Sequence, residues 1–109
     1  MSQHILYSQF KNREVVVMMG WDRPLQRYYL CIFESESEKL LYSDQRDRDK
    51  TVEAMTTEYF STVLSNFNIH VPDVFIQNVN DDGRKDVKDR IVKYRQIDGE
   101  VWCCDSVCN

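Results

Sequence analysis

The sequence predicts an α+β fold in which an antiparallel β-sheet carries two α-helices packed on one of its faces. Two β-prone apolar runs, Val15–Trp21 and Tyr28–Phe33, are joined by a short turn and indicate a hairpin. Asp49–Phe67 repeats apolar residues every three or four positions, and a second helix starts at Pro72. Because domains commonly contain about 100–150 residues, the 109 residues of this chain are expected to form a single domain.

The first thirteen residues resemble a lead-in to the hairpin. Ile5, Tyr7 and Phe10 allow a short edge strand, but Lys11-Asn12-Arg13 interrupts the apolar pattern. We therefore expect at most an edge strand before the Val15–Phe33 hairpin.

The hairpin is apolar on both of its faces. A strand that alternates apolar and polar residues can leave one face in water, whereas these two strands cannot. We expect the sheet to need cover on both sides, from the chain's own helices and from a partner. In the turn, Pro24 fixes φ for a type I or II turn, and Gly20 predicts a bulge or a close approach of another backbone.

The connection after the hairpin, residues 34–50, is polar with alternating charges and is expected to be exposed. Within it, Leu40-Leu41-Tyr42 predicts a third short strand.

Asp49–Phe67 gives the clearest helix signal in the chain, with one wide apolar stripe. Asp49 or Thr51 is expected to cap its start, and Asn66 or Asn68 to close it. The stripe consists of Val52, Met55, Tyr59, Phe60, Val63, Leu64 and Phe67.

The second predicted helix has Pro72 at its first position and Asp73 in its first turn, where the helix dipole favours a carboxylate. It is expected to run to about Asn80 and to end at Asp81-Asp82-Gly83. Its inward residues are Val71, Val74, Phe75 and Val79.

The last part of the chain admits two interpretations. Lys85–Tyr94 has the four-residue charge spacing of a helix. Asp98-Gly99, however, is a strong two-residue turn signal between two β-prone runs. The second signal favours a hairpin at Arg90–Cys104.

Charge is unevenly distributed along a chain of net charge −4. Residues 51–83 contain no Lys or Arg and carry the carboxylates Glu53, Glu58, Asp73, Asp81 and Asp82. Nucleic-acid binding is disfavoured because it requires clustered basic residues. The acidic third of the chain, with Glu53 and Glu58 as candidate contacts, suits either a basic partner protein or a solvated surface.

No secretory or membrane-spanning segment is evident, because the Val15–Trp21 run is much shorter than the ~20 residues of a spanning helix. We expect a cytoplasmic protein that does not bind membranes and whose four cysteines are thiols.

Neither a metal site nor a cofactor is predicted. Cys104 and Cys108 have a workable spacing for zinc, but no second cysteine pair exists. His4 and His70 with scattered serines do not form a catalytic triad. Whether the chain is an enzyme stays open, and these observations favour a protein that is not one.

The best candidate for recognition is the hairpin turn. Trp21, Asp22, Arg23, Gln26 and Tyr28 combine rings, a guanidinium, a carboxylate and an amide, and Trp and Arg are enriched at interface hot spots. An equally concrete alternative is that Asp22 and Arg23 close the turn while Trp21 anchors it to the core.

Three functions follow from this architecture. The first is a non-enzymatic interaction protein that forms a homodimer through the uncovered sheet face or through the sheet's edge. The second is an acidic inhibitor or immunity-type protein. The third is a small-molecule-binding module whose apolar pocket between sheet and helices is lined by Met18, Trp21, Tyr28, Met55 and Phe60.

The run Gly20-Trp21-Asp22-Arg23-Pro24-Leu25-Gln26 between two strands, followed by an amphipathic helix and a Pro72-Asp73 helix start, resembles short bacterial proteins carried on mobile gene cassettes. The resemblance covers Glu14 to Asp82. It implies a bacterial, accessory, single-domain protein and carries over no activity.

Overall fold

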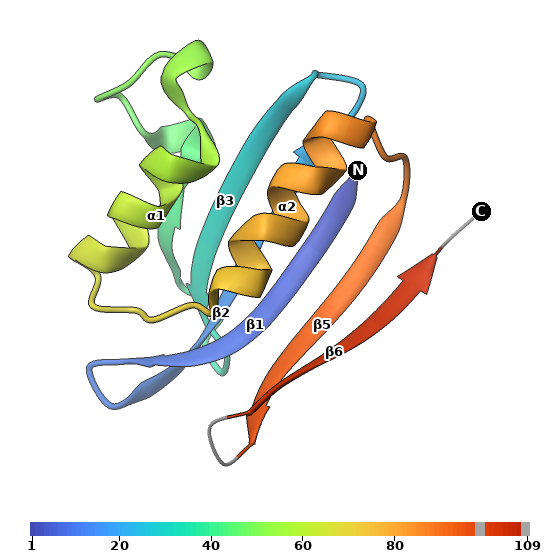
Figure 1. Ribbon diagram of the computed structural model, residues 1–109. Coiled ribbons are helices and arrows are strands. Elements are labelled where there is room, and N and C mark those ends of the chain that lie inside the picture. Colours follow the sequence, from blue (N-terminus) through green and yellow to red (C-terminus); the bar gives the residue numbers. More distant parts are fainter. Residues whose placement is uncertain (98–99, 108–109) are drawn as a thin grey trace.

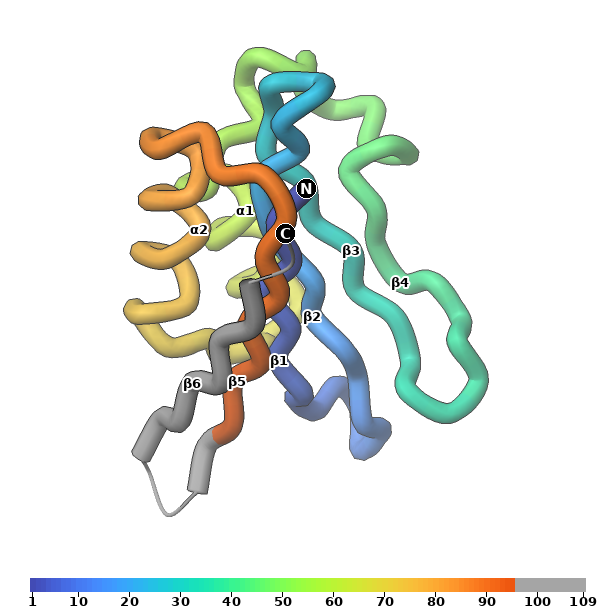
Figure 2. The backbone as a smooth tube through the Cα atoms, turned by 90° about the vertical axis from the view of Figure 1, so that its right-hand side faces the viewer, coloured from blue at the N-terminus to red at the C-terminus, as the bar shows by residue number. Residues whose placement is uncertain are grey.

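The computed structural model describes residues 1–97 and 100–107, with side chains for residues 1–95. These residues form a six-stranded sheet in the order β4-β3-β2-β1-β5-β6. Neighbouring strands are antiparallel except β1 and β5, which are parallel. Both helices, α1 and α2, lie on the same side of the sheet (Figures 1 and 2). The predicted α+β fold with two helices on one face is confirmed, and the sheet is mostly antiparallel.

The strands are β1 (Ser2–Phe10), β2 (Arg13–Asp22), β3 (Arg27–Glu34), β4 (Leu40–Ser43), β5 (Arg90–Ile97) and β6 (Glu100–Val107). The helices are α1 (Thr57–Asn66) and α2 (Asp73–Lys85), with short 3₁₀ turns η1 (Asp44–Arg46) and η2 (Val52–Ala54) between β4 and α1. No helix in the described part of the chain is both long enough and apolar enough to cross a bilayer.

The prediction that the first residues are a lead-in with at most an edge strand is wrong. β1 runs from Ser2 to Phe10 and pairs on one side with β2 and on the other with β5. Lys11 and Asn12, both with positive φ, form the turn into β2. The strand escaped notice because two of its buried inward positions, Ser2 and His4, are polar.

The β2–β3 hairpin forms as predicted, with Trp21 opposite Tyr28 and Val15 opposite Glu34. Five side chains that face the helices are fully buried; they are Val15, Val17, Met19, Leu30 and Ile32. Phe60 and Leu64 of α1 and Phe75 and Val79 of α2 cover them from the other layer. Since burying one large apolar side chain contributes about 1.5–3 kcal/mol, this interface is a main source of stability.

The first helix begins later than predicted. Thr56 caps α1, because its Oγ1 accepts a hydrogen bond from the backbone N–H of Tyr59 at 3.2 Å. Asp49 and Thr51 do not cap it, and Val52, counted in the apolar stripe, is 47% exposed in η2. Asn68 follows the helix with a φ of 57°, as expected of a closing asparagine.

The second helix is longer than predicted at its C-terminal end. Pro72 is its N-cap, and the helix continues through Asp81-Asp82-Gly83 to Lys85. Asp82 extends the inward face set by Phe75 and Val79 and is 1% exposed. The acidic side chain of Asp82 suggested a helix end, but in the structure it lies in the interior, where His4 and Arg90 bind it.

Two further strand predictions are confirmed. Leu40–Tyr42 lies in β4, and β5 pairs with β6 as an antiparallel hairpin with Lys93 opposite Cys104. The ambiguous Lys85–Tyr94 stretch divides between the end of α2 and the start of β5. The predicted Asp98-Gly99 turn and the side chains of the C-terminal cysteines lie outside the described residues.

Gly20 marks a close backbone approach, one of the two outcomes predicted for it. A Cβ at this position would collide with the carbonyl oxygen of Ser2 and stand 2.9 Å from the Tyr29 hydroxyl. Tyr29 reaches across β2 at this point, and its hydroxyl donates a 2.5 Å hydrogen bond to the same Ser2 oxygen. The pairing of Gly20 with Tyr29 is in regular register, so there is no bulge here.

We expect Gly20→Ala to lower the free energy of unfolding by about 1–3 kcal/mol, because the added methyl group overpacks against backbone. Gly83→Ala is the matched control. Its Cβ would meet the side chain of Tyr28 instead of backbone, and alanine favours a helix by about 1 kcal/mol over glycine, so the loss should be smaller. Urea unfolding followed by circular dichroism compares them; equal losses would contradict the close approach.

Candidate functional site

The turn between β2 and β3 is tied to the end of α2 through the carboxylate of Asp86. Oδ1 of Asp86 accepts hydrogen bonds from the Trp21 indole N–H and the Gln26 amide, each at 2.9 Å. Oδ2 accepts one from Arg23 Nε at 3.2 Å. We call these four residues the turn cluster. The structure thus brings together three of the five residues predicted for recognition here.

The other two have separate roles nearby. Asp22 Oδ1 accepts a 3.3 Å hydrogen bond from the backbone N–H of Leu25 and so shapes the turn. The Tyr28 ring packs edge-on against Trp21 at 4.9 Å between centroids. Its hydroxyl donates to the backbone oxygen of Asn80 at 3.4 Å, and burial raises the pKa of this hydroxyl.

Asp86 is the residue that the sequence did not reveal. It follows α2 in the left-handed conformation, with a φ of 53°, a geometry that Asp tolerates better than most residues. A carboxylate at a helix C-terminus is unfavourable for the helix dipole. The hydrogen bonds from Trp21, Gln26 and Arg23 compensate and hold the pKa of Asp86 below its usual range. The donors of the predicted recognition site are therefore used within the protein.

We expect Asp86→Asn to weaken the Trp21 indole hydrogen bond, because the acceptor loses its charge while asparagine keeps the left-handed backbone. The Trp21 indole N–H signal should move upfield in a ¹⁵N–¹H spectrum and exchange faster with solvent. Asp89→Asn is the control, since Asp89 bonds the N-terminal amine instead. An unchanged Trp21 signal in Asp86→Asn would contradict the cluster.

A second constellation, also missed from the sequence, lies inside the protein where β1, α2 and β5 meet. His4 Nε2 is 2.6 Å from Asp82 Oδ2, and His4 Nδ1 is 2.6 Å from the Tyr94 hydroxyl. Arg90 donates to Asp82 Oδ1 at 2.5 Å. Asn78 donates to the Tyr94 hydroxyl at 3.0 Å. The spacing of Phe75, Val79 and Asp82 on one helix face was the available signal.

A histidine hydrogen-bonded to a carboxylate has the geometry of a general base, but His4 and Asp82 stabilise the fold. His4, Asp82 and Tyr94 are 0%, 1% and 1% exposed, so a substrate cannot reach them. Because an ionised carboxylate only accepts, His4 Nε2 carries the proton that faces Asp82. Burial alone would raise the pKa of Asp82, but His4, Ser2 and Arg90 outweigh it and hold that pKa below its usual value.

We expect Asp82→Asn to lower the free energy of unfolding by about 2–4 kcal/mol at pH 7, because the buried partners lose a charged acceptor. The folded-state pKa of Asp82 is depressed, so its contribution is present above the unfolded value near pH 4 and is lost as the pH falls through the folded value. Urea titrations from pH 6 to pH 2.5 should therefore show wild type and variant converging below pH 4. A constant difference would contradict the assignment.

The sheet face opposite the helices carries apolar side chains from three adjacent strands. Cross-strand register aligns Ile5 with Met18 and Met18 with Cys31, and Tyr7 with Val16 and Val16 with Phe33. We call these six residues the open face. Tyr7 is 55% exposed, Ile5, Met18, Cys31 and Phe33 are partly exposed, and Val16 between Tyr7 and Phe33 is buried. Burial raises the pKa of the Cys31 thiol.

The remaining predicted contacts, Glu53 and Glu58, belong neither to the turn cluster nor to the open face. Both are exposed, Glu53 in η2 and Glu58 in the first turn of α1, where the helix dipole favours a carboxylate. Two of the residues predicted to line a small-molecule pocket do not meet, because Met18 lies on the open face while Phe60 lies in the core on the other side of the sheet. Among the described residues no group of His, Cys, Asp and Glu side chains is arranged to hold a metal ion.

Comparison with known proteins adds no relative from which a role can be transferred. No protein-family model, curated protein or solved structure matches the chain. The resemblance to gene-cassette proteins stays a prediction, and the function has to be argued from the geometry of the fold.

Proposed function

We propose that the protein acts by contact and not by catalysis, and that it forms a homodimer through the open face. The observation that supports this proposal is the double row of apolar side chains on that face. Ile5, Met18 and Cys31 form one of the two rows, across three strands. Both helices lie on the other side of the sheet, so they do not cover these residues (Figure 2).

Standard interfaces bury about 800 Å² per partner, so a dimer through this side of the sheet has to bury the open face together with the polar positions around it. Packing two sheets face to face at a small angle also interdigitates side chains in the way that β-sandwiches do. Tyr7, Met18 and Phe33 supply the large side chains that such a layer needs.

Charge around the open face suits a second copy of the same chain. The outward positions of β5 bring Lys93 beside Ile5, while Glu14 and Asp22 occupy outward positions at the two ends of β2. A surface that carries both signs can complement itself, whereas a surface of one sign would repel its copy. This observation favours self-association over the capture of a basic partner through Glu53 and Glu58.

The test is sedimentation velocity in reducing buffer. We expect wild type to be dimeric at micromolar concentration and Tyr7→Glu/Met18→Glu to be monomeric and folded, because two buried charges would oppose the interface. Leu25→Glu is the matched control: Leu25 is 58% exposed but lies in the β2–β3 turn, away from the open face. It should remain dimeric.

A wild-type monomer at 100 µM would overturn the proposal. Mass-spectrometric mapping of thiol alkylation locates the interface independently, because Cys31 should react more slowly in the dimer than in the monomeric variant. Equal Cys31 reactivity in a confirmed dimer would place the interface elsewhere, such as at a sheet edge.

A further inference from the structure

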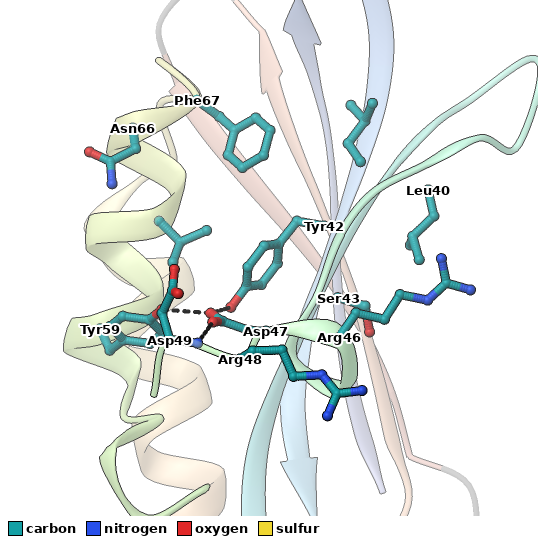
Figure 3. A pocket seen from close by; sticks show the side chains of 12 residues that line it. Leu40, Tyr42, Ser43, Arg46, Asp47, Arg48, Asp49, Tyr59, Asn66 and Phe67 are labelled. Carbon is teal, nitrogen blue, oxygen red and sulfur yellow. Dashed lines mark hydrogen bonds between the residues drawn. The ribbon is translucent and has the colours of Figure 1, made fainter. Parts of the chain in front are cut away.

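A hollow of about 550 Å³ lies between β4, the residues that follow it and α1. We call it the edge pocket (Figure 3). Tyr42 contributes one wall and contacts Phe67, which puts the edge pocket on the helix side of the sheet, separate from the open face. Its volume falls within the range of about 300–1,000 Å³ that is typical of small-molecule sites.

Asp47 holds two aromatic side chains of the edge pocket in place. Its Oδ2 accepts hydrogen bonds from the hydroxyls of Tyr42 at 2.6 Å and Tyr59 at 2.5 Å, and its Oδ1 accepts one from the backbone N–H of Asp49 at 2.9 Å. The hydrogen bonds from the two tyrosines hold the pKa of Asp47 below its usual range. Asp47 is thus an ionised brace whose oxygens are already engaged, and it positions two aromatic rings.

Arg46 and Arg48 flank Asp47 and line the same pocket. Both are exposed, and within the part of the chain that the structure describes neither guanidinium has a hydrogen bond or ion pair. Arg13, Arg23 and Arg90, by contrast, each pair with a carboxylate. Two unpaired cations at the rim of a concave surface form a site for an anion, and guanidinium pairs with oxyanions such as carboxylate and phosphate through two parallel hydrogen bonds.

The pocket also has aromatic walls, Tyr42 from β4 and Tyr59 and Phe67 from α1 and its C-terminal end. Tyr42 and Phe67 stand edge to face, 6.4 Å between centroids, and Figure 3 shows Arg46 and Arg48 on the β4 side and Tyr59 and Phe67 on the α1 side. A planar ring placed against these walls gains aromatic contact beyond its buried area.

We propose that the edge pocket binds a small planar aromatic molecule with one acidic group. The acidic group pairs with Arg46 and Arg48, and the ring lies against Tyr42 and Phe67. Asp49 lines the pocket as well, near α1 in Figure 3. Its negative charge disfavours a second acidic group on the ligand.

The test titrates two fluorescent probes of matched shape, 8-anilinonaphthalene-1-sulfonate and its uncharged analogue N-phenyl-1-naphthylamine. We expect the sulfonate to bind with one-to-one stoichiometry. Arg46→Gln/Arg48→Gln should raise its Kd at least about tenfold and change that of the analogue less than about twofold. Arg13→Gln/Arg84→Gln removes the same charge elsewhere and should leave both Kd values unchanged.

Two more variants locate the site. Asn66→Trp places a large ring at the rim of the pocket, from an exposed position at the end of α1, and should weaken binding of both probes. Asp49→Asn should lower the sulfonate Kd about two- to threefold, because a repelling charge is removed. Circular dichroism verifies that each variant is folded.

No saturable sulfonate binding, or binding that Arg46→Gln/Arg48→Gln or Asn66→Trp leaves unchanged, would overturn the proposal. The monomeric variant Tyr7→Glu/Met18→Glu should keep full sulfonate affinity, and loss of binding there would assign the probe to the open face instead. The outcome is therefore independent of whether the protein dimerises.

Discussion

The buried carboxylate of Asp82 is the constraint on which the arrangement of the sheet depends. An ionised group in the core must be paired, and its partners come from two different strands, His4 from β1 and Arg90 from β5. Those strands are the parallel pair of the sheet. Since parallel neighbours cannot be joined by a tight turn, β1 and β5 are brought together through the intervening β2–β4 and both helices. The Asp82 carboxylate on α2 therefore stabilises the pairing of β1 with β5, two neighbouring strands that are far apart in sequence.

Carboxylates perform the same joining role in two other places. Asp86 connects the β2–β3 turn to α2, and Asp47 connects β4 to α1 through the hydroxyls of Tyr42 and Tyr59. In each case one acidic side chain accepts donors from more than one element, and in each case those donors depress the pKa of the carboxylate. An acidic chain can thus convert part of its negative charge into specific contacts between its layers.

The features predictable from the sequence are those set by apolar periodicity. The β2–β3 hairpin, the bodies of both helices and the C-terminal hairpin each follow a local pattern that the structure retains. The missed first strand and the early end predicted for α2 both involve polar residues that face inward. Ser2 and His4 concealed β1, and Asp82 appeared to end α2, because their partners lie up to 90 residues away. Three residues of the turn cluster, Trp21, Arg23 and Gln26, were predicted from the sequence, whereas their shared acceptor Asp86 carries no local signal. The edge pocket combines residues from β4, η1 and α1, which sequence spacing does not place together.

The position of β1 has a consequence for folding during synthesis. β1 carries a histidine whose acceptor lies 78 residues further along the chain, so the strand is synthesised long before that acceptor. Until that segment emerges, β1 pairs only with β2 and exposes a polar group at what will become the middle of the core. Contacts of such sequence separation slow folding. The β1–β2 and β2–β3 hairpins are therefore expected to reach their final packing only after α2 and β5 have been synthesised.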